Sequence, residues 1–450
     1  MKNLPALGLA LLLLSGCAAQ HYEMPAHDVL TQSQIEERYS IDRAWWKQYA
    51  DPKLDALVDM ALERNIDLAR STISVNRALY RARQLGAELV PSFNGDGSAS
   101  SRTALDDGSS SRSFSASLGL NYELDLWGRL RDAASAQAWE HLATEQDLEA
   151  TRLALVNSVI NTWYSMAYTR QALELSRQNL AFYEQLYRIT EEKFRSGKID
   201  GLDPAQTEQS LLNQRSTLLS IENRLADEER TLRDLLNLRP EEALPVADMD
   251  LMAVNVPAVD LNVPVAALGA RPDVQAAALR LQRAFSNYEA SKKDLYPTLS
   301  IGGTLGASAT SSADWFTSPF VSGLLSLKLP FLDWNRVKWN MRISEADFED
   351  AKLAFEKSLV TSLNEIERYY RGLANAMQQL ENDKKTLDAD RRVEAYRKAR
   401  YELGADEMKD WLDALRSLNS TQLSVLEAKY SVISATNAVY EAMGGRISTR

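Results

Sequence analysis

The residues that could carry chemistry are few in this sequence. Cys17 is the single Cys, and the three His residues, His21, His27 and His141, are scattered. One Cys cannot form an intramolecular disulfide, a Cys-based zinc site or an iron–sulfur cluster, and scattered His residues disfavour a His-rich metal centre. No phosphate-binding loop or nucleophile motif stands out. The sequence therefore predicts no enzyme, no metal site and no cofactor.

Two carboxylates have a spacing that suggests a joint function. Asp410 and Asp413 are separated by one turn of an expected helix, so they lie on the same helical face. The alternative is a pair of solvated helix charges, which is the usual role of a surface Asp.

Composition narrows the class of protein. The chain of 450 residues has 51 Lys and Arg against 62 Asp and Glu, which gives a formal net charge of −11. A dedicated nucleic-acid binder needs a basic face, so no nucleic-acid partner is expected. The length suffices for one large domain or for two or three ordinary domains with a proper core.

The first residues resemble a bacterial lipoprotein signal. Lys2 supplies a short positive region, an apolar stretch follows, and Leu14-Ser15-Gly16-Cys17 resembles a lipobox. The resemblance implies removal of residues 1–16 and lipid attachment at Cys17, with Ala18 pointing to the outer membrane. An ordinary signal peptide with an incidental Cys is the alternative. No later stretch has about 18 consecutive apolar residues, so no transmembrane helix is expected.

The sequence repeats itself at a nearly constant spacing. The segment Leu89-Val90-Pro91-Ser92-Phe93 corresponds to Leu295-Tyr296-Pro297-Thr298-Leu299, 206 positions later. Two further landmarks recur 207 positions later: Trp127-Gly128-Arg129 with Trp334-Asn335-Arg336, and Phe194-Arg195-Ser196-Gly197 with Tyr401-Glu402-Leu403-Gly404. A constant offset through three landmarks indicates a duplication.

Each repeat contains two stretches with the alternation of a β-strand. From Ser113 to Leu126, apolar residues alternate with small polar ones. A polar face that is small and uncharged for long stretches suits a water-filled lumen, whereas a soluble sheet lying on a core is the alternative. Four strands cannot close a barrel, and open edges are not tolerated in lipid. Several copies must combine, and three would give a twelve-stranded outer-membrane β-barrel.

Long helices follow the strands. Residues 129–196 contain no Gly or Pro, and apolar residues recur there every seven positions, which is typical of a coiled coil. We expect the rods to end at Gly197 and Gly404 and a new helix to follow each glycine. Asp203, directly before Pro204, is the expected N-cap of the first returning helix.

The pattern divides the mature chain into two structural repeats. They cover 17–238 and 265–450, joined by a proline-rich linker over 239–264. In each repeat a helix and a β-hairpin precede long helices, with the hairpin and long helices at about 92–126 and 129–238 in the first, and at about 298–329 and 336–443 in the second. The expected fold is α+β, a barrel continued by helical coiled coils.

Several motifs of this chain resemble those of one family. They cover nearly the whole mature chain and comprise Trp45-Trp46-Lys47-Gln48-Tyr49-Ala50-Asp51-Pro52-Lys53-Leu54, Leu126-Trp127-Gly128-Arg129, Arg271-Pro272-Asp273-Val274 and Tyr401-Glu402-Leu403-Gly404. Together they resemble TolC-type outer-membrane channels, in particular the lipoprotein branch that serves resistance–nodulation–division efflux pumps. The resemblance implies a trimer with a twelve-stranded barrel and a long periplasmic tunnel. The tip of that tunnel would contact a periplasmic adaptor and an inner-membrane pump.

The same resemblance implies a function and functional residues. Such channels conduct small toxic compounds, drugs or metal ions, passively. Asp410 and Asp413 resemble acidic aperture residues at the periplasmic gate of the family. Tyr401, Asp203 and Arg416 resemble the network that ties the tip shut. Lys409 departs from the pattern, because lipoprotein relatives often carry an apolar residue there.

Two other functions stay open at this point. A channel for protein secretion shares the same fold. A coiled-coil lipoprotein scaffold would suit the heptads and the lipid anchor, but it would leave the four alternating strands without a purpose. The lipobox, the short C-terminal tail and the double Trp motif favour small-molecule efflux. The ten Met residues are spread along the chain, so they do not distinguish metal export from drug export.

Overall fold

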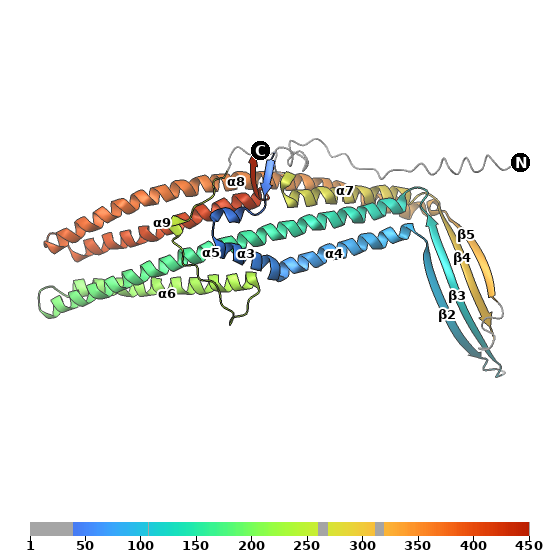
Figure 1. The fold of residues 1–450 in the computed structure, drawn as a ribbon, viewed down its shortest axis with the longest axis horizontal. Helices are drawn as coiled ribbons and strands as arrows, with labels where there is room; N and C mark the ends of the chain where they lie inside the picture. The colour runs from blue at the N-terminus through green and yellow to red at the C-terminus, as the bar shows by residue number, and fades with distance from the viewer. Residues whose placement is uncertain (1–38, 107, 260–268, 311–318, 450) are drawn as a thin grey trace. The chain divides into compact units, whose positions relative to one another are not determined.

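The computed structural model describes residues 39–106, 108–259, 269–310 and 319–449 (Figure 1). The elements are β1 (Tyr39–Asp42), η1 (Trp45–Tyr49), α3 (Pro52–Arg64), α4 (Ile66–Gly86), η2 (Ala87–Leu89), β2 (Ser92–Thr103), β3 (Ser110–Leu124), α5 (Arg129–Arg195), α6 (Leu202–Leu236), η3 (Leu251–Ala253), α7 (Pro272–Lys293), β4 (Thr298–Ala309), β5 (Pro319–Lys328), η5 (Pro330–Asp333), α8 (Trp334–Glu402), α9 (Met408–Ala442) and β6 (Arg446–Thr449). The predicted order of helix, two strands and long helices therefore occurs twice.

The chain folds into two compact units. The sheet unit contains the described parts of Thr72–Asp147 and Asp273–Ser358. The hairpin unit is named for its two helical hairpins, in which α5 turns into α6 and α8 turns into α9. It contains 39–71 and the described parts of Leu148–Pro272 and Leu359–Arg450. The long helices α5 and α8 each contribute residues to both units, so the units do not coincide with the sequence repeats.

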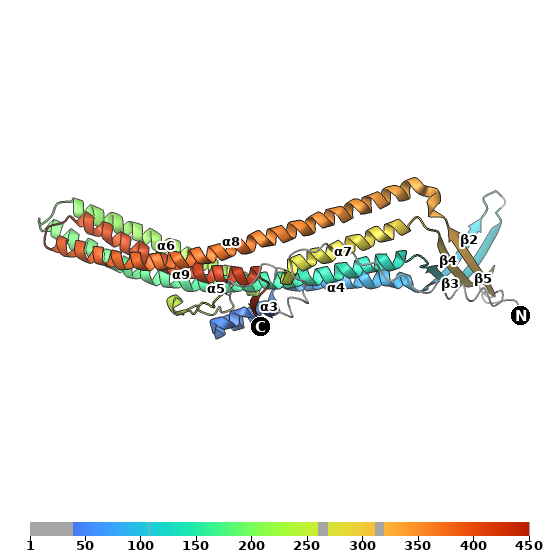
Figure 2. The same cartoon turned by 90° about the horizontal axis from the view of Figure 1, so that it is seen from above.

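The sheet unit holds a four-stranded antiparallel sheet in the order β2-β3-β4-β5, whose strands lie side by side in Figure 1 and overlap in Figure 2. The registers place Ser92 opposite Asn121, Phe114 opposite Ala309 and Thr298 opposite Lys328. The alternation predicted from Ser113 to Leu126 is the strand β3, which begins three residues earlier and ends two residues earlier. Strands β2 and β5 form the two edges of this sheet.

A capped corner leads from β3 into α5. The Asp125 carboxylate accepts hydrogen bonds from the backbone N–H groups of Leu130 (3.1 Å) and Arg131 (3.0 Å), which have no partner inside the first helical turn. Gly128 supplies the positive φ of 78° that the corner needs. The Trp127 indole N–H donates to the carbonyl of Pro297 at 2.8 Å. This motif thus ties the first repeat to the second.

The core of the hairpin unit explains the double Trp motif. Trp45 and Trp163 are completely buried, together with apolar residues of α3, α5 and α6. Asp51 caps α3 by accepting from the backbone N–H groups of Lys53 and Leu54, and it also accepts from the Trp163 indole N–H at 2.8 Å. One carboxylate therefore both starts α3 and satisfies a buried indole on α5.

The apolar residues that recur every seven positions lie on α5, and the positions 207 residues later form a corresponding stripe on α8. Both stripes are core over part of their length. Their buried members are Val159, Met166 and Leu173 on α5 and Ile366, Leu373 and Leu380 on α8. Phe194, the last member on α5, is 47% exposed. The stripe thus leaves the core before α5 ends.

Candidate functional site

Both hairpins of the hairpin unit turn at a glycine in the left-handed region (left end of Figure 1). The φ angle is +69° at Gly197 and +72° at Gly404. In the first turn Gly197 N–H donates to the Phe194 carbonyl and Lys198 N–H to the Lys193 carbonyl, each at 2.9 Å. The same two bonds close the second turn at the same length. This paired arrangement is a common helix end that favours glycine, because an L side chain is strained at such φ.

The N-cap predicted at Asp203 is wrong. Helix α6 begins at Leu202 with Gly201 as its N-cap, which places Asp203 inside the first turn. The Asp200 carboxylate accepts a hydrogen bond from the Leu202 backbone N–H at 2.9 Å, and so satisfies the first N–H group of the helix. Pro204 still fits, because the first N–H groups of a helix lack intrahelical partners in any case.

The three residues of the predicted closing network are not bonded to one another within the described chain. The Tyr401 ring stacks on Trp411, with centroids 5.4 Å apart. Arg416 Nη1 lies 3.2 Å from the Asp413 carboxylate, and its Nη2 donates to Ser210 Oγ at 2.8 Å. Lys193 lies near both Tyr401 and Asp203. Its ammonium is 5.4 Å from the centroid of the Tyr401 ring, and its positive charge acts to lower the pKa of Asp203.

The two predicted gate carboxylates lie in the first turns of α9. Met408, Trp411 and Leu412 of this segment are buried in a cluster with residues of α5 and α6. Asp410 is half-buried beside that cluster, whereas Asp413 is exposed. Because Asp413 already pairs with Arg416, the two acids differ in their surroundings although one helical turn separates them.

Asp406, in the second turn, is a site residue that the sequence did not reveal. Its carboxylate accepts from Arg397 Nη1 at 2.9 Å and from Arg400 Nε at 2.7 Å, and its side chain is 6% exposed. Arg400 also donates to the Ala405 carbonyl at 3.3 Å. The signal available in the sequence was a pair of Arg residues three apart, followed by a turn glycine and then an acid.

The acids near the two turns have pKa values shifted in opposite directions. Hydrogen bonds from Arg397 and then Arg400 hold the pKa of the Asp406 carboxyl below its ordinary value. Burial, followed by the nearby Asp200 charge, raises the pKa of the Asp203 carboxyl. The second turn therefore stabilises its charged acid, while the first turn disfavours one of its acids in the charged form.

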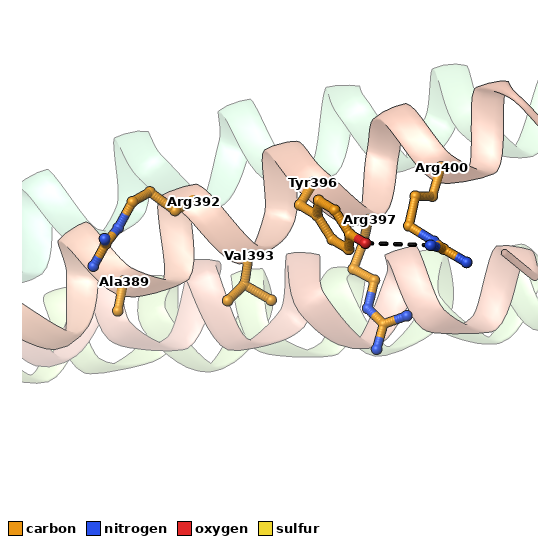
Figure 3. Close-up of a pocket in the computed structure, with 6 residues that line it drawn as sticks. All are labelled: Ala389, Arg392, Val393, Tyr396, Arg397 and Arg400. Carbon is orange, nitrogen blue, oxygen red and sulfur yellow. Dashed lines mark hydrogen bonds between the residues drawn. The ribbon is translucent and has the colours of Figure 1, made fainter. Parts of the chain in front are cut away.

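The outer face of α8 near the second turn is apolar with a basic border (Figure 3). Ala389, Val393 and Tyr396 follow one another at spacings of four and three residues, and the last two are 49% and 59% exposed. The basic border is formed by Arg392, Arg397 and Arg400. Arg400 donates to the Tyr396 hydroxyl at 3.2 Å, which is the dashed line in Figure 3.

Several predictions lie outside the described residues. These are the signal over 1–16, the lipidation site Cys17, and residues 260–268 around the end of the linker. Among the helices of the described ranges, none is both long and apolar enough to cross a membrane. Over the same residues, no group of three His, Cys, Asp or Glu side chains is placed to hold a metal ion.

Comparison with known families decides the identity of this architecture. Residues 57–238 and 263–445 match the family model of the outer membrane efflux protein. The chain belongs to the outer membrane efflux protein family. The resemblance that the motifs indicated is thereby confirmed, and this efflux protein is located in the outer membrane.

The relatives of this efflux protein are similar over their full length. It is 39% identical to the toxin and drug export protein A of Aggregatibacter actinomycetemcomitans, over 97% of this chain and 96% of the relative. It is 26% identical to the cation efflux system protein CusC of Escherichia coli O157:H7, over 96% of each chain. A crystal structure of CusC superposes with a TM-score of 0.84 at 23% identity, covering 95% of this chain and 99% of that one. The predicted fold class is confirmed by this likeness.

Proposed function

We propose that three copies of this efflux protein form the outer-membrane exit channel of a tripartite efflux system. The observation that carries the proposal is a four-stranded sheet whose edges, β2 and β5, have no neighbouring strand among the described residues. Lipid cannot satisfy the backbone groups of an open edge. Three copies joined edge to edge supply twelve strands and close the sheet into a barrel.

Exposed helical seams support the same assembly. On α6, Leu202, Leu212 and Leu219 are 57%, 52% and 60% exposed. They are ten and seven residues apart, so they occupy apolar positions of one coiled-coil heptad pattern. On α8, Val393 and Tyr396 have the three-residue spacing of the same pattern. We infer that α6 of one copy packs against this α8 face of the next, which buries both stripes from water.

The assembly conducts and does not catalyse. An inner-membrane pump of the resistance–nodulation–division type, with a periplasmic adaptor, supplies the energy, and the cargo is a small toxic compound. The names of the relatives, which cover drug export and cation efflux, support this cargo class. Lipidation at Cys17 adds an anchor in the outer membrane to that of the barrel.

The gate lies at the two hairpin turns. Threefold symmetry converts Asp410 and Asp413 into rings of carboxylates that favour cations. Asp203, Tyr401 and Arg416 are not bonded to one another among the described residues, and we propose that they act as a closing network through contacts between copies. Arg416 also offsets the charge of Asp413 at 3.2 Å, so Asp410 is the stronger selectivity residue.

Native mass and conductance test this function. The mature protein, extracted from outer membranes in mild detergent, is expected to have the mass of three chains. In planar bilayers the double change Asp410→Asn and Asp413→Asn should lower cation preference, and Asp203→Ala should raise conductance. A stable monomer would overturn the channel. A trimer whose selectivity and conductance ignore these substitutions would overturn the gate alone.

Export of a toxin is the second candidate. The 39% identical relative is named for toxin export as well as drug export. Deleting this chain should sensitise cells to dyes and drugs if it serves small-molecule efflux. Unchanged drug sensitivity, together with loss of one secreted protein from the medium, would favour secretion.

A further inference from the structure

The two edge strands carry opposite charges that lack a full partner. Lys328, at the end of β5, is exposed and forms no ion pair within 4 Å among the described residues, although its charge acts at longer range on Asp294 of the same chain. Asp96 on β2 is exposed too, and its Oδ2 accepts one hydrogen bond from Asn94 Nδ2 at 2.9 Å. The other carboxylate oxygen of Asp96 is available for a cation.

The internal repeat predicts the register of the second β-hairpin, β4–β5, from the register of the first, β2–β3. The repeat shift is 206 positions from β2 to β4 and 207 positions from β3 to β5, as the landmarks before and after the strands show. Applied to Ser92 and Asn121, which lie opposite each other, these shifts give Thr298 and Lys328. Thr298 and Lys328 do lie opposite each other. The shifts therefore reproduce the register of one hairpin from that of the other.

The same shifts convert the residues of the central strand pair, β3–β4, into residues of the two edge strands. In the β3–β4 pair, Asn121 lies opposite Gly302. Moving Asn121 forward by 207 positions gives Lys328 on β5, and moving Gly302 back by 206 positions gives Asp96 on β2. Strands β5 and β2 are at opposite edges of one sheet, so their pairing requires two copies of the chain.

We propose that β5 of one copy pairs antiparallel with β2 of the next copy, with Lys328 opposite Asp96 of the partner subunit. The inference rests on the proposed trimer and specifies the joint that closes it. In this register each β5 residue and its β2 partner have numbers that sum to 424. Ser326 then lies opposite Ser98 of the partner subunit, and Leu325 opposite Ala99 of the partner subunit.

The faces of the strands agree with this register. Asp96 lies opposite Ser117 and Lys328 opposite Thr298, so both belong to the polar face of the sheet. Ala99 lies opposite Phe114 and Leu325 opposite Ile301, which places both on the apolar face. A shift of one residue would mix the two faces. Opposite charges directly across a strand pair are also favourable, whereas like charges are not.

Disulfide trapping in outer membranes tests the register. Ser326→Cys combined with Ser98→Cys should give covalent dimers and trimers on oxidation, because opposite Cβ atoms are about 5 Å apart. The matched control is Ser326→Cys with Ser100→Cys, a diagonal pair at about 7–8 Å. Ser98 and Ser100 are equivalent within the chain, since each bonds a Ser hydroxyl of β3 at 2.8 Å. The unmodified chain, with Cys17 alone, should give no covalent species.

The outcomes separate the register from the channel function. Preferential trapping of the Ser98 pair supports the proposal. Preferential trapping of the Ser100 pair, or a native trimer in which neither pair is trapped, rejects the register and leaves the channel intact. A monomer in which neither pair is trapped rejects both.

A charge exchange tests the ion pair itself. Lys328→Asp should weaken trimer association about fivefold by facing Asp96 of the partner subunit with a like charge. Adding Asp96→Lys should restore it. A double variant no better than the single one would overturn the ion pair, and Lys328→Gln reports any general loss of folding.

Discussion

The two hairpin turns share a backbone but differ in the side chains that hold them. Both end a long helix with the same pair of bonds around a left-handed glycine, 207 residues apart. The first turn relies on Thr190 and Thr207, completely buried hydroxyls 2.9 Å apart. The second uses Asp406 between Arg397 and Arg400, where the first has Ile199 and Thr190 at the positions of Asp406 and Arg397.

This difference shows how duplicated backbones acquire separate duties. A neutral hydroxyl pair is insensitive to pH and to nearby charge. An acid held by two guanidinium groups depends on both. The second turn is also the one followed by Asp410, Trp411 and Asp413. We infer that the first helical hairpin is the support that depends less on pH, and that the second is the one that changes with pH and nearby charge.

The largest expected effect comes from Trp411→Ala. Trp411 stacks on Tyr401, contacts Phe182 edge-on and donates to Glu394 at 2.9 Å. Its loss should destabilise the second turn by about 3 kcal/mol. Hydrogen exchange of the purified protein should quicken over 403–407 and stay unchanged over 196–201. Equal quickening at both turns would mean that the hairpins are not separate, and Trp411→Phe measures the indole hydrogen bond alone.

A smaller effect is expected from Asp406→Asn. The two Arg residues lower the pKa of Asp406, so the stability it contributes is present above the unfolded pKa and is lost as pH falls through the folded one. Exchange over 403–407 should therefore quicken at pH 7, and the difference from the parent should shrink as the pH falls below the unfolded pKa and through the folded one. Asp200→Asn is the control in the first turn, because Asn caps a helix end about as well as Asp. A difference that persists at low pH would contradict the charge-based account.

The smallest effect is expected from Asp203→Asn, with the opposite sign. The pKa of Asp203 is raised, mainly by burial, so its ionisation opposes folding once the pH exceeds the unfolded pKa. The amide should slow exchange in the first turn of α6 at pH 7, by less than about threefold because the carboxyl is only half-buried and solvent still screens its charge. Below the unfolded pKa the variant and the parent should agree. Faster exchange at pH 7 would show that the charged form of Asp203 is stabilising.

Much of this fold could be predicted because its patterns are local. The alternation from Ser113 to Leu126 specifies a strand by period two, and Gly197 and Gly404 mark the turns because positive φ favours glycine. The repeat offset then gives the order of elements without any knowledge of packing. The strand and turn signals can be read from the sequence because each depends on neighbours within a few residues, and the repeat offset needs only a comparison of the chain with itself.

The side-chain contacts at the turns could not be predicted in the same way. The hydrogen bonds from Arg400 and Arg397 to Asp406 join residues six and nine positions apart. They cross a turn, so they can be predicted only when the path of that turn is known. The N-cap prediction for α6 is wrong because two acids lie close to the start of the helix. Asp200 precedes the helix and Asp203 lies in its first turn, and only the path of the backbone distinguishes them. Equally, Trp163 and Asp51 are 112 residues apart, and nothing local joins them.

The unpaired edges of the sheet have a genetic consequence. When β2 of every copy must find β5 of another copy, each joint is heterologous and a ring closes only if all its joints are sound. A chain that folds with a damaged edge still enters rings through its intact edge and spoils them. Such alleles should be dominant over the normal gene when both are expressed in one cell, whereas alleles that prevent folding altogether should be recessive.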